Sequence, residues 1–188
     1  MMRIALIGSH NTGKTSLYDK MYSKIDFSDF KFFPEVIREV AKLGFKINEE
    51  SDDAAQLAMC AMHLKHLYVD NFVTDRCLLD NFVYAWVIST YENSSISMNC
   101  VRVLDMYFRK HKDDYDLYVY CPIEFDMKDD GFRTTNTKFQ EDIDKTFRYM
   151  LNCINPEKVL YVSGETVDRY EQVLSKVKEL KSKGDKDE

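Results

Sequence analysis

Gly8-Ser9-His10-Asn11-Thr12-Gly13-Lys14-Thr15 is the stretch that decides the fold of this chain, because it has the pattern G-x-x-x-x-G-K-[ST] of a phosphate-binding loop. The apolar run at residues 3–7 precedes it and predicts a buried strand, and residues 16–22 follow with apolar side chains at helical spacing. A strand that turns directly into a helix points free backbone N–H groups and the positive end of the helix dipole at one spot. We therefore expect the chain to bind a nucleoside triphosphate.

The side chains of this loop have separate expected roles. Lys14 is expected to face solvent rather than the core and to reach the β- and γ-phosphates, and the Thr15 hydroxyl is expected to ligate Mg²⁺. The residues expected to bind the nucleotide are Gly8, Asn11, Thr12, Gly13, Lys14, Thr15 and Ser16.

Composition is that of a globular protein. The chain has 188 residues, of which 45% are hydrophobic and 31% charged, and we expect one domain over residues 1–180 followed by a charged, frayed tail at 181–188. The net charge of −6 argues against a general duplex-DNA binder, which needs a basic surface, although a local basic cleft stays open. No apolar run approaches the ~20 residues of a membrane span, and we expect a cytoplasmic protein. Five scattered cysteines predict free buried thiols.

Strands and helices alternate along the chain, which predicts an α/β fold with a parallel sheet covered by helices on both faces. The expected strands are residues 3–7, 29–33, 71–75, 115–121 and 158–162. The expected helices after the loop are residues 35–43, 51–69, 79–90 and 96–110, one that carries Phe139 to Leu151, and one that carries Val167 to Leu180. Ser51 is the expected N-cap of the long helix. His63 and His66 lie three residues apart in it, where we expect a solvated or half-buried face rather than a metal site.

Polar residues follow two of the expected strands, and the carboxyl ends of parallel strands face the ligand crevice. Asp75 would lie within reach of Mg²⁺ or its waters, and Arg76 would point at the acceptor or the transferring phosphate. The alternative for this pair is an ordinary surface ion pair. Glu35 could accept a proton from an attacking hydroxyl, or could be an acid in the first turn of a helix.

A polar segment at about residues 124–137 has the composition of a mobile lid. Within it, Arg133 follows Asp129-Asp130-Gly131-Phe132 and is the first choice for a contact with the transferring phosphoryl group. The alternative is an exposed loop whose charges are simply solvated.

Two classes of phosphate-binding protein are excluded because the sequence lacks their motifs. A GTPase needs D-x-x-G and N-K-x-D, and the chain has neither. An ATPase motor usually carries an apolar strand that ends in Asp-Glu, whereas Asp75 is followed by Arg76.

Four segments in order, GSHNTGKTSL, FFPEVIREV, TDRCLLDNFVYA and PIEFDMKDDGFR, resemble small P-loop kinases. The likeness is to the nicotinamide riboside kinase branch with its phage and bacterial relatives, and more distantly to deoxynucleoside and thymidylate kinases. It covers roughly residues 2–151. It implies a five-stranded parallel sheet, ATP and Mg²⁺ on the P-loop, and an acceptor in the crevice beyond it. It also implies that Glu35, Asp75 and Arg76 meet the acceptor and the metal.

The expected function is that of a kinase that moves the γ-phosphoryl group of ATP to a hydroxyl or phosphate of a nucleoside-like small molecule. Lys14 holds phosphates, Thr15 and Asp75 hold Mg²⁺, and Arg76 and Arg133 neutralise the transferring charge. Glu35 is the expected general base, with Asp75 as the competing assignment.

Two other functions stay open at this point. The first is a kinase that acts on a 5-hydroxymethylated pyrimidine or an end within DNA, since some phage relatives use such acceptors. The second, from another class, is a nucleotide-binding regulator or non-catalytic ATPase. The identity of the acceptor and the presence of a homodimer are also open.

Overall fold

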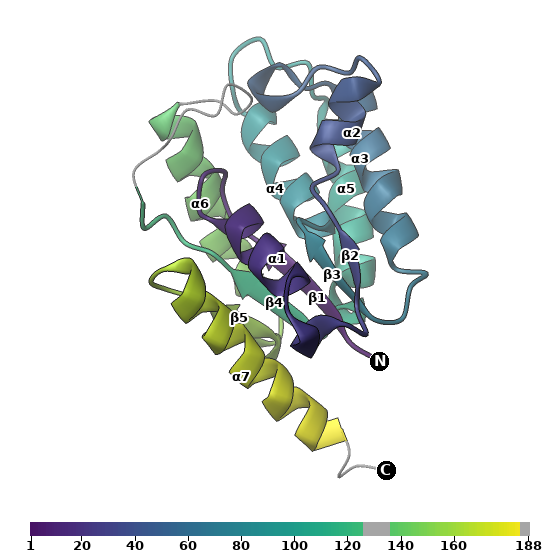
Figure 1. Ribbon diagram of the computed structural model, residues 1–188. Coiled ribbons are helices and arrows are strands. Elements are labelled where there is room, and N and C mark those ends of the chain that lie inside the picture. The colour runs from purple at the N-terminus through teal and green to yellow at the C-terminus, as the bar shows by residue number, and fades with distance from the viewer. Residues whose placement is uncertain (126–135, 185–188) are drawn as a thin grey trace.

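The computed structural model describes residues 1–125 and 136–184, and it contains one parallel sheet of five strands in the order β2-β3-β1-β4-β5 (Figure 1). The strands are β1 (Arg3–Ile7), β2 (Lys31–Phe33), β3 (Phe72–Asp75), β4 (Leu117–Tyr120) and β5 (Val159–Tyr161). β1 lies between β3 and β4, with Ala5 opposite Thr74 on one side and Tyr118 on the other. The predicted five-stranded α/β architecture is confirmed.

Helices cover both faces of this sheet. They are α1 (Lys14–Tyr22), α2 (Ile37–Lys42), α3 (Asp53–His66), α4 (Leu78–Ser89), α5 (Met98–His111), α6 (Thr137–Leu151) and α7 (Thr166–Gly184). Short 3-10 helices are η1 (Ile25–Phe27), η2 (Asn48–Glu50), η3 (Lys112–Asp114) and η4 (Pro156–Lys158). α1 and α7 lie side by side over one face, whereas α4, α5 and α6 cover the other (Figure 1). α3 packs against α4 and α5, and α2 packs against α3.

The alternation of side chains along β1 assigns its residues to two cores. Ile4 and Leu6 pack in the core under α1 and α7, and Ala5 and Ile7 pack in the core under α4, α5 and α6. All four are fully buried, which is why this strand is apolar at consecutive positions rather than at every second one. Burial of each large side chain contributes roughly 1.5–3 kcal/mol, so both cores depend on this central strand.

Most element boundaries differ from the expected ones by one or two residues, and the caps and ends of two helices differ in ways that have a structural reason. Asp52, not Ser51, caps α3, and its carboxylate accepts from the Ala55 N–H at 2.9 Å. The Ser51 hydroxyl instead accepts from Gln56 Nε2 at 2.9 Å. α3 ends at His66, three residues before the expected end, and α7 continues to Gly184, so residues 181–184 of the expected tail are helical.

The environments of two residue types also differ from expectation. His63 and His66 are both buried rather than solvated or half-buried, and the His66 ring stacks on Phe33 at 3.9 Å between centroids. Burial lowers the pKa of His63 to about 3 and that of His66 to about 4, so both rings are neutral at pH 7. Cys153 is exposed, whereas the other four cysteines are buried as expected.

Across residues 1–125 and 136–184, no helix is both long enough and apolar enough to span a membrane.

Candidate active site

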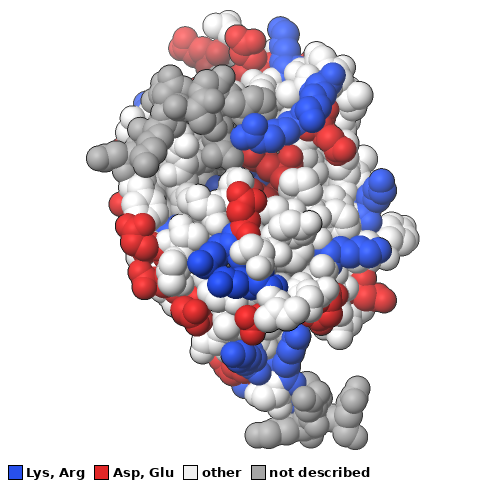
Figure 2. All heavy atoms as spheres, in the orientation of Figure 1, with Lys and Arg blue, Asp and Glu red and all other residues white. Residues whose placement is uncertain are grey.

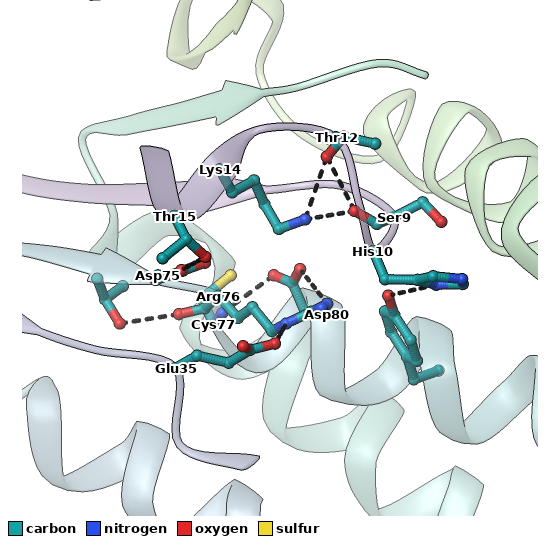
Figure 3. A network of polar contacts seen from close by, with 12 residues as sticks. Ser9, His10, Thr12, Lys14, Thr15, Glu35, Asp75, Arg76, Cys77 and Asp80 are labelled. Atoms are coloured by element: carbon teal, nitrogen blue, oxygen red, sulfur yellow. Dashed lines mark hydrogen bonds and ion pairs between the residues drawn. The ribbon is translucent and has the colours of Figure 1, made fainter. Parts of the chain in front are cut away.

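The phosphate-binding loop lies between the end of β1 and the start of α1, where the sequence places it (Figure 3). Gly8 has a φ of +133°, and a Cβ there would lie 2.5 Å from the Cys121 carbonyl oxygen, so no other residue fits. Gly13 has a φ of +81° and immediately precedes α1. The loop therefore approaches β4 closely and then presents the free N–H groups of the first turn of α1. Ser16 is exposed in this turn.

Lys14 is buried, contrary to the expectation that it faces solvent. It is 3% exposed, and its ammonium donates to Thr12 Oγ1 at 3.2 Å and to the Ser9 carbonyl oxygen. The Thr12 hydroxyl itself donates to the Ser9 carbonyl at 2.9 Å, so the loop folds back around the cation (Figure 3). Burial, assisted by the positive charge of Arg76, lowers the pKa of Lys14 to about 8. The cation is thus desolvated in advance of any contact with phosphate.

Thr15 and Asp75 meet at the junction of α1 and β3. Their approach follows from the sheet register, which pairs Leu6 at the end of β1 with Asp75 at the end of β3. Thr15 Oγ1 donates to Asp75 Oδ2 at 2.9 Å, and Asp75 is 2% exposed. Asp75 Oδ1 is buried and has no hydrogen-bond partner among the described residues. Burial first, and then the charge of Glu35, raise the pKa of Asp75. A hydroxyl beside a carboxylate with one open oxygen suits a hard cation such as Mg²⁺.

Arg76 and Glu35 form a buried ion pair, and Asp75 and Arg76 are both buried, so the alternative of a surface ion pair for Asp75 and Arg76 does not hold. Arg76 Nε donates to Glu35 Oε1 at 2.5 Å, and the two residues are 8% and 6% exposed. Glu35 precedes α2 and is outside its first turn, so the favourable helix-start position is not what holds it. Asp80 Oδ1 lies 3.7 Å from Arg76 Nη1, and the Tyr84 ring centre lies 4.7 Å from the guanidinium. Figure 3 shows Arg76 between the two carboxylates.

A pocket that is partly open to solvent adjoins this ion pair. Its walls come from the P-loop, from the segment between β2 and α3, and from α3 and α4; they include His10, Glu35, Gln56, Arg76, Asn81 and Tyr84. Asp75 is not among the described residues that line it. The pocket therefore contacts the P-loop at one end and the Glu35–Arg76 pair along its side.

Several polar residues of this pocket were not identified from the sequence. Asn81 Nδ2 donates to Gln56 Oε1 at 2.6 Å, and Gln56 Nε2 donates to the Ser51 hydroxyl at 2.9 Å. Asp80 accepts from the Cys77 N–H at 3.0 Å in the first turn of α4. The spacing of Asp80 and Asn81, one helical turn after Arg76, is a signal that could have indicated them. No comparable signal marks Gln56.

One predicted catalytic residue has no position here. Arg133 and most of the expected lid at 124–137 lie outside the described residues. Among those that are described, the structure brings Lys14, Thr15, Glu35, Asp75 and Arg76 to one edge of the sheet (Figure 3).

Together these groups provide the elements of phosphoryl transfer. They are a glycine-containing loop at a helix N-terminus, a desolvated lysine, a hydroxyl–carboxylate pair that fits a metal ion, and a buried carboxylate beside a pocket.

Comparison with known proteins agrees with this arrangement. The sequence profile of the AAA domain family matches residues 3–169. No curated protein sequence gives a significant match. Among solved structures, the NadR protein in complex with NR has a TM-score of 0.73 and 21% identity, over 95% of this chain and 51% of that chain. This chain therefore spans about half the length of NadR.

Two further solved structures match nearly end to end. Deoxyadenosine kinase from M. mycoides, with products dCMP and dCDP bound, has a TM-score of 0.66 and 15% identity, over 95% of this chain and 100% of that chain. Thymidylate kinase from Candida albicans has a TM-score of 0.65 and 15% identity, over 100% and 93%. The predicted resemblance to small P-loop kinases is confirmed at the level of the fold. Because the matching profile extends from β1 to the start of α7, this chain belongs to the AAA domain family.

Proposed function

We propose that this protein is an ATP-dependent kinase that transfers the γ-phosphoryl group to a nucleoside, nucleotide or similar small molecule bound in the pocket. The observation that carries the proposal is the buried Glu35–Arg76 pair, which lies along a pocket that also contacts the P-loop. A regulator that only binds ATP would not need a buried carboxylate paired with a buried guanidinium beside a second ligand site. The names of the similar solved structures include both nucleoside and nucleotide kinases, so either acceptor class is consistent with the fold.

The loop amides and Lys14 bind the phosphates of ATP in this proposal. Mg²⁺, held by Thr15 and Asp75, would supply positive charge to the phosphates when it is bound. Glu35 accepts the proton of the attacking hydroxyl in this proposal, because it lines the pocket whereas Asp75 does not and instead contacts Thr15 of the P-loop.

Arg76 is the residue proposed to neutralise the charge that develops on the transferring group. Its Nη1 has no hydrogen-bond partner among the described residues, which leaves a donor for phosphate. Its contacts with Glu35 and Asp80 hold the guanidinium in place before a substrate arrives.

The test is ADP release from ATP and Mg²⁺ with a panel of acceptors, namely free nucleosides, nucleoside monophosphates, and DNA with 5-hydroxymethylpyrimidine. We expect strong acceleration by one of the small-molecule classes, and loss of this acceleration in Lys14→Ala. Arg109→Ala, which removes a surface ion pair with Asp105 on α5, is the matched control and should keep full turnover.

Two outcomes would change the proposal. Acceleration by the DNA alone would assign a polymer acceptor. The face that carries α1 and α7 does not favour this outcome, because basic and acidic side chains are interspersed on it (Figure 2). ATP binding without acceleration by any acceptor would favour the non-catalytic regulator.

A further inference from the structure

Arg169 is a buried cation with no part in the chemistry proposed above. It lies in the first turns of α7 and is 1% exposed, and it is the largest fully buried side chain of the described residues. Its guanidinium makes three hydrogen bonds, each to a different segment. Nη1 donates to the Thr12 carbonyl at 2.5 Å, Nε to the Gly164 carbonyl at 2.8 Å, and Nη2 to Glu124 Oε2 at 2.9 Å. One side chain therefore joins the P-loop, the loop before α7 and the segment after β4.

The contact with Thr12 bears directly on phosphate binding. The Thr12 carbonyl and the Gly13 N–H belong to the same peptide unit, and in a trans peptide these groups point in opposite directions. A hydrogen bond that holds the Thr12 carbonyl toward Arg169 therefore holds the Gly13 N–H in the opposite direction, away from Arg169. Loop N–H groups with a fixed direction are what binds phosphate at a helix N-terminus.

The Thr12–Gly13 peptide needs such an anchor because its second residue is glycine. Gly13 has a φ of +81°, and glycine adopts positive and negative φ with similar ease. A Cβ at Gly13 would lie 3.2 Å from Arg169 Nη1, so the guanidinium packs directly against the backbone at this point. The orientation of this peptide is thus set by α7 rather than by the loop sequence alone.

The remaining contacts extend the same link to the segment after β4. Glu124 balances the buried charge of Arg169 and also accepts from the Gly164 N–H at 2.9 Å. The Phe125 ring centre lies 4.8 Å from the guanidinium, and this ring is 38% exposed. The P-loop backbone and the chain at 124–125 therefore share one rigid support.

We propose that Arg169 is a positioning residue for the triphosphate, which it favours by holding the Thr12–Gly13 peptide in the orientation that binds phosphate. The inference rests on the proposed nucleotide site, but it does not require phosphoryl transfer. A purely structural arginine would affect thermal stability and leave the phosphate affinity of the folded protein unchanged.

The test measures the affinities of the full chain for ATP·Mg²⁺ and for inorganic tripolyphosphate, which lacks the nucleoside. In Arg169→Met, both affinities should fall by about tenfold or more, the scale of a charge-assisted hydrogen bond, while the acceptor KM changes little. Arg169→Lys keeps one donor to the loop and should restore part of the affinity. Tyr170→Phe is the matched control, because Tyr170 is the next residue of α7 and donates to Asp26 instead, at 2.8 Å.

Far-UV circular dichroism and the melting temperature show whether each variant is folded. If Arg169→Met does not fold, Arg169→Lys and Glu124→Gln take its place, and both should weaken tripolyphosphate binding. Folded variants that bind tripolyphosphate like the wild type would overturn the proposal, even if their stability is reduced. If the wild type binds tripolyphosphate but transfers no phosphoryl group, only the proposed kinase function is contradicted. The affinities of the variants would still decide the role of Arg169.

Discussion

Replacement of Lys14 by Met should make the protein more stable while it abolishes binding of the triphosphate. Lys14 is a buried ammonium whose hydrogen-bond acceptors are one carbonyl and one hydroxyl, and no carboxylate of residues 1–125 and 136–184 lies at hydrogen-bond distance from it. Methionine is of similar length, so the change removes the charge and leaves the volume nearly filled. The phosphates of ATP, in contrast, would lose the cation that meets them.

The size of the stabilisation follows from the pKa of Lys14. Its fall from 10.5 to about 8 corresponds to a cost of roughly 3 kcal/mol for keeping the ammonium buried and charged. The variant loses the two hydrogen bonds of the ammonium, worth about 1 kcal/mol each, although the Ser9 carbonyl still accepts from the Thr12 hydroxyl. We expect Lys14→Met to raise the free energy of unfolding by about 1 kcal/mol at neutral pH.

The stabilisation should depend on pH with a defined sign. The pKa of Lys14 is lower in the folded protein than in the unfolded chain. The free-energy cost of burying the charged ammonium is therefore absent above the unfolded pKa of 10.5 and appears as the pH falls to about 8. The advantage of the variant is therefore complete at pH 7 and shrinks as the pH rises above about 8.

Urea unfolding of both proteins at several pH values measures this difference, with Lys20→Met on the same helix as the control. ATP·Mg²⁺ should raise the melting temperature of the wild type and not that of Lys14→Met. A variant that is less stable than the wild type at neutral pH would refute the claim that the buried charge is costly. A variant that keeps the ATP-dependent shift would refute the role of Lys14.

Three further substitutions separate the proposed roles of the acidic residues. Asp75→Asn should raise the Mg²⁺ concentration needed for half-maximal ADP release, with partial recovery in excess Mg²⁺; an unchanged Mg²⁺ dependence argues against a metal site at Thr15 and Asp75. Glu35→Gln should lower turnover by about 10²-fold or more, with little change in acceptor KM, and should remove the acid limb of the pH–rate profile. If turnover is retained, Asp75 takes the base role. Burial raises the pKa of Asp80 from 3.8 to about 6, so the stability that its protonated form contributes below about pH 4 is lost as the pH rises through about 6. Between about pH 4 and about pH 7, Asp80→Asn should therefore lose roughly 2 kcal/mol less of its free energy of unfolding than the wild type does, as measured by thermal unfolding. Equal losses would contradict the idea that the buried Asp80 carboxylate is costly to ionise.

The amino-acid sequence by itself determined the elements that depend on local pattern. The phosphate-binding loop is recognisable because its glycines, lysine and threonine are all within eight residues of each other. The strands are recognisable because a buried parallel strand is a short apolar run, as in β1. Asp75 and Arg76 could be placed at the crevice because they directly follow such a run, and the carboxyl ends of parallel strands share one edge.

Local pattern also misplaced some residues, because side-chain contacts in the folded protein, rather than periodicity, determine their environments. Lys14 is buried because Ser9 and Thr12 close around it, which no periodicity encodes. His66 is buried because it stacks on Phe33, from another element of the fold. Ser51 and Asp52 are equally good helix caps by type; in the folded protein Asp52 caps α3 and Ser51 contacts Gln56 instead.

The tertiary structure alone decided which distant residues form direct pairs. Glu35 and Arg76 are 41 residues apart and pair because β2 lies next to β3 in the sheet. Arg169 and Thr12 are 157 residues apart and meet because α7 packs beside α1. Side-chain periodicity determines which face of an element is buried, but the order of strands and the packing of helices depend on the summed contacts of the whole core, and these determine the partner of each buried charge.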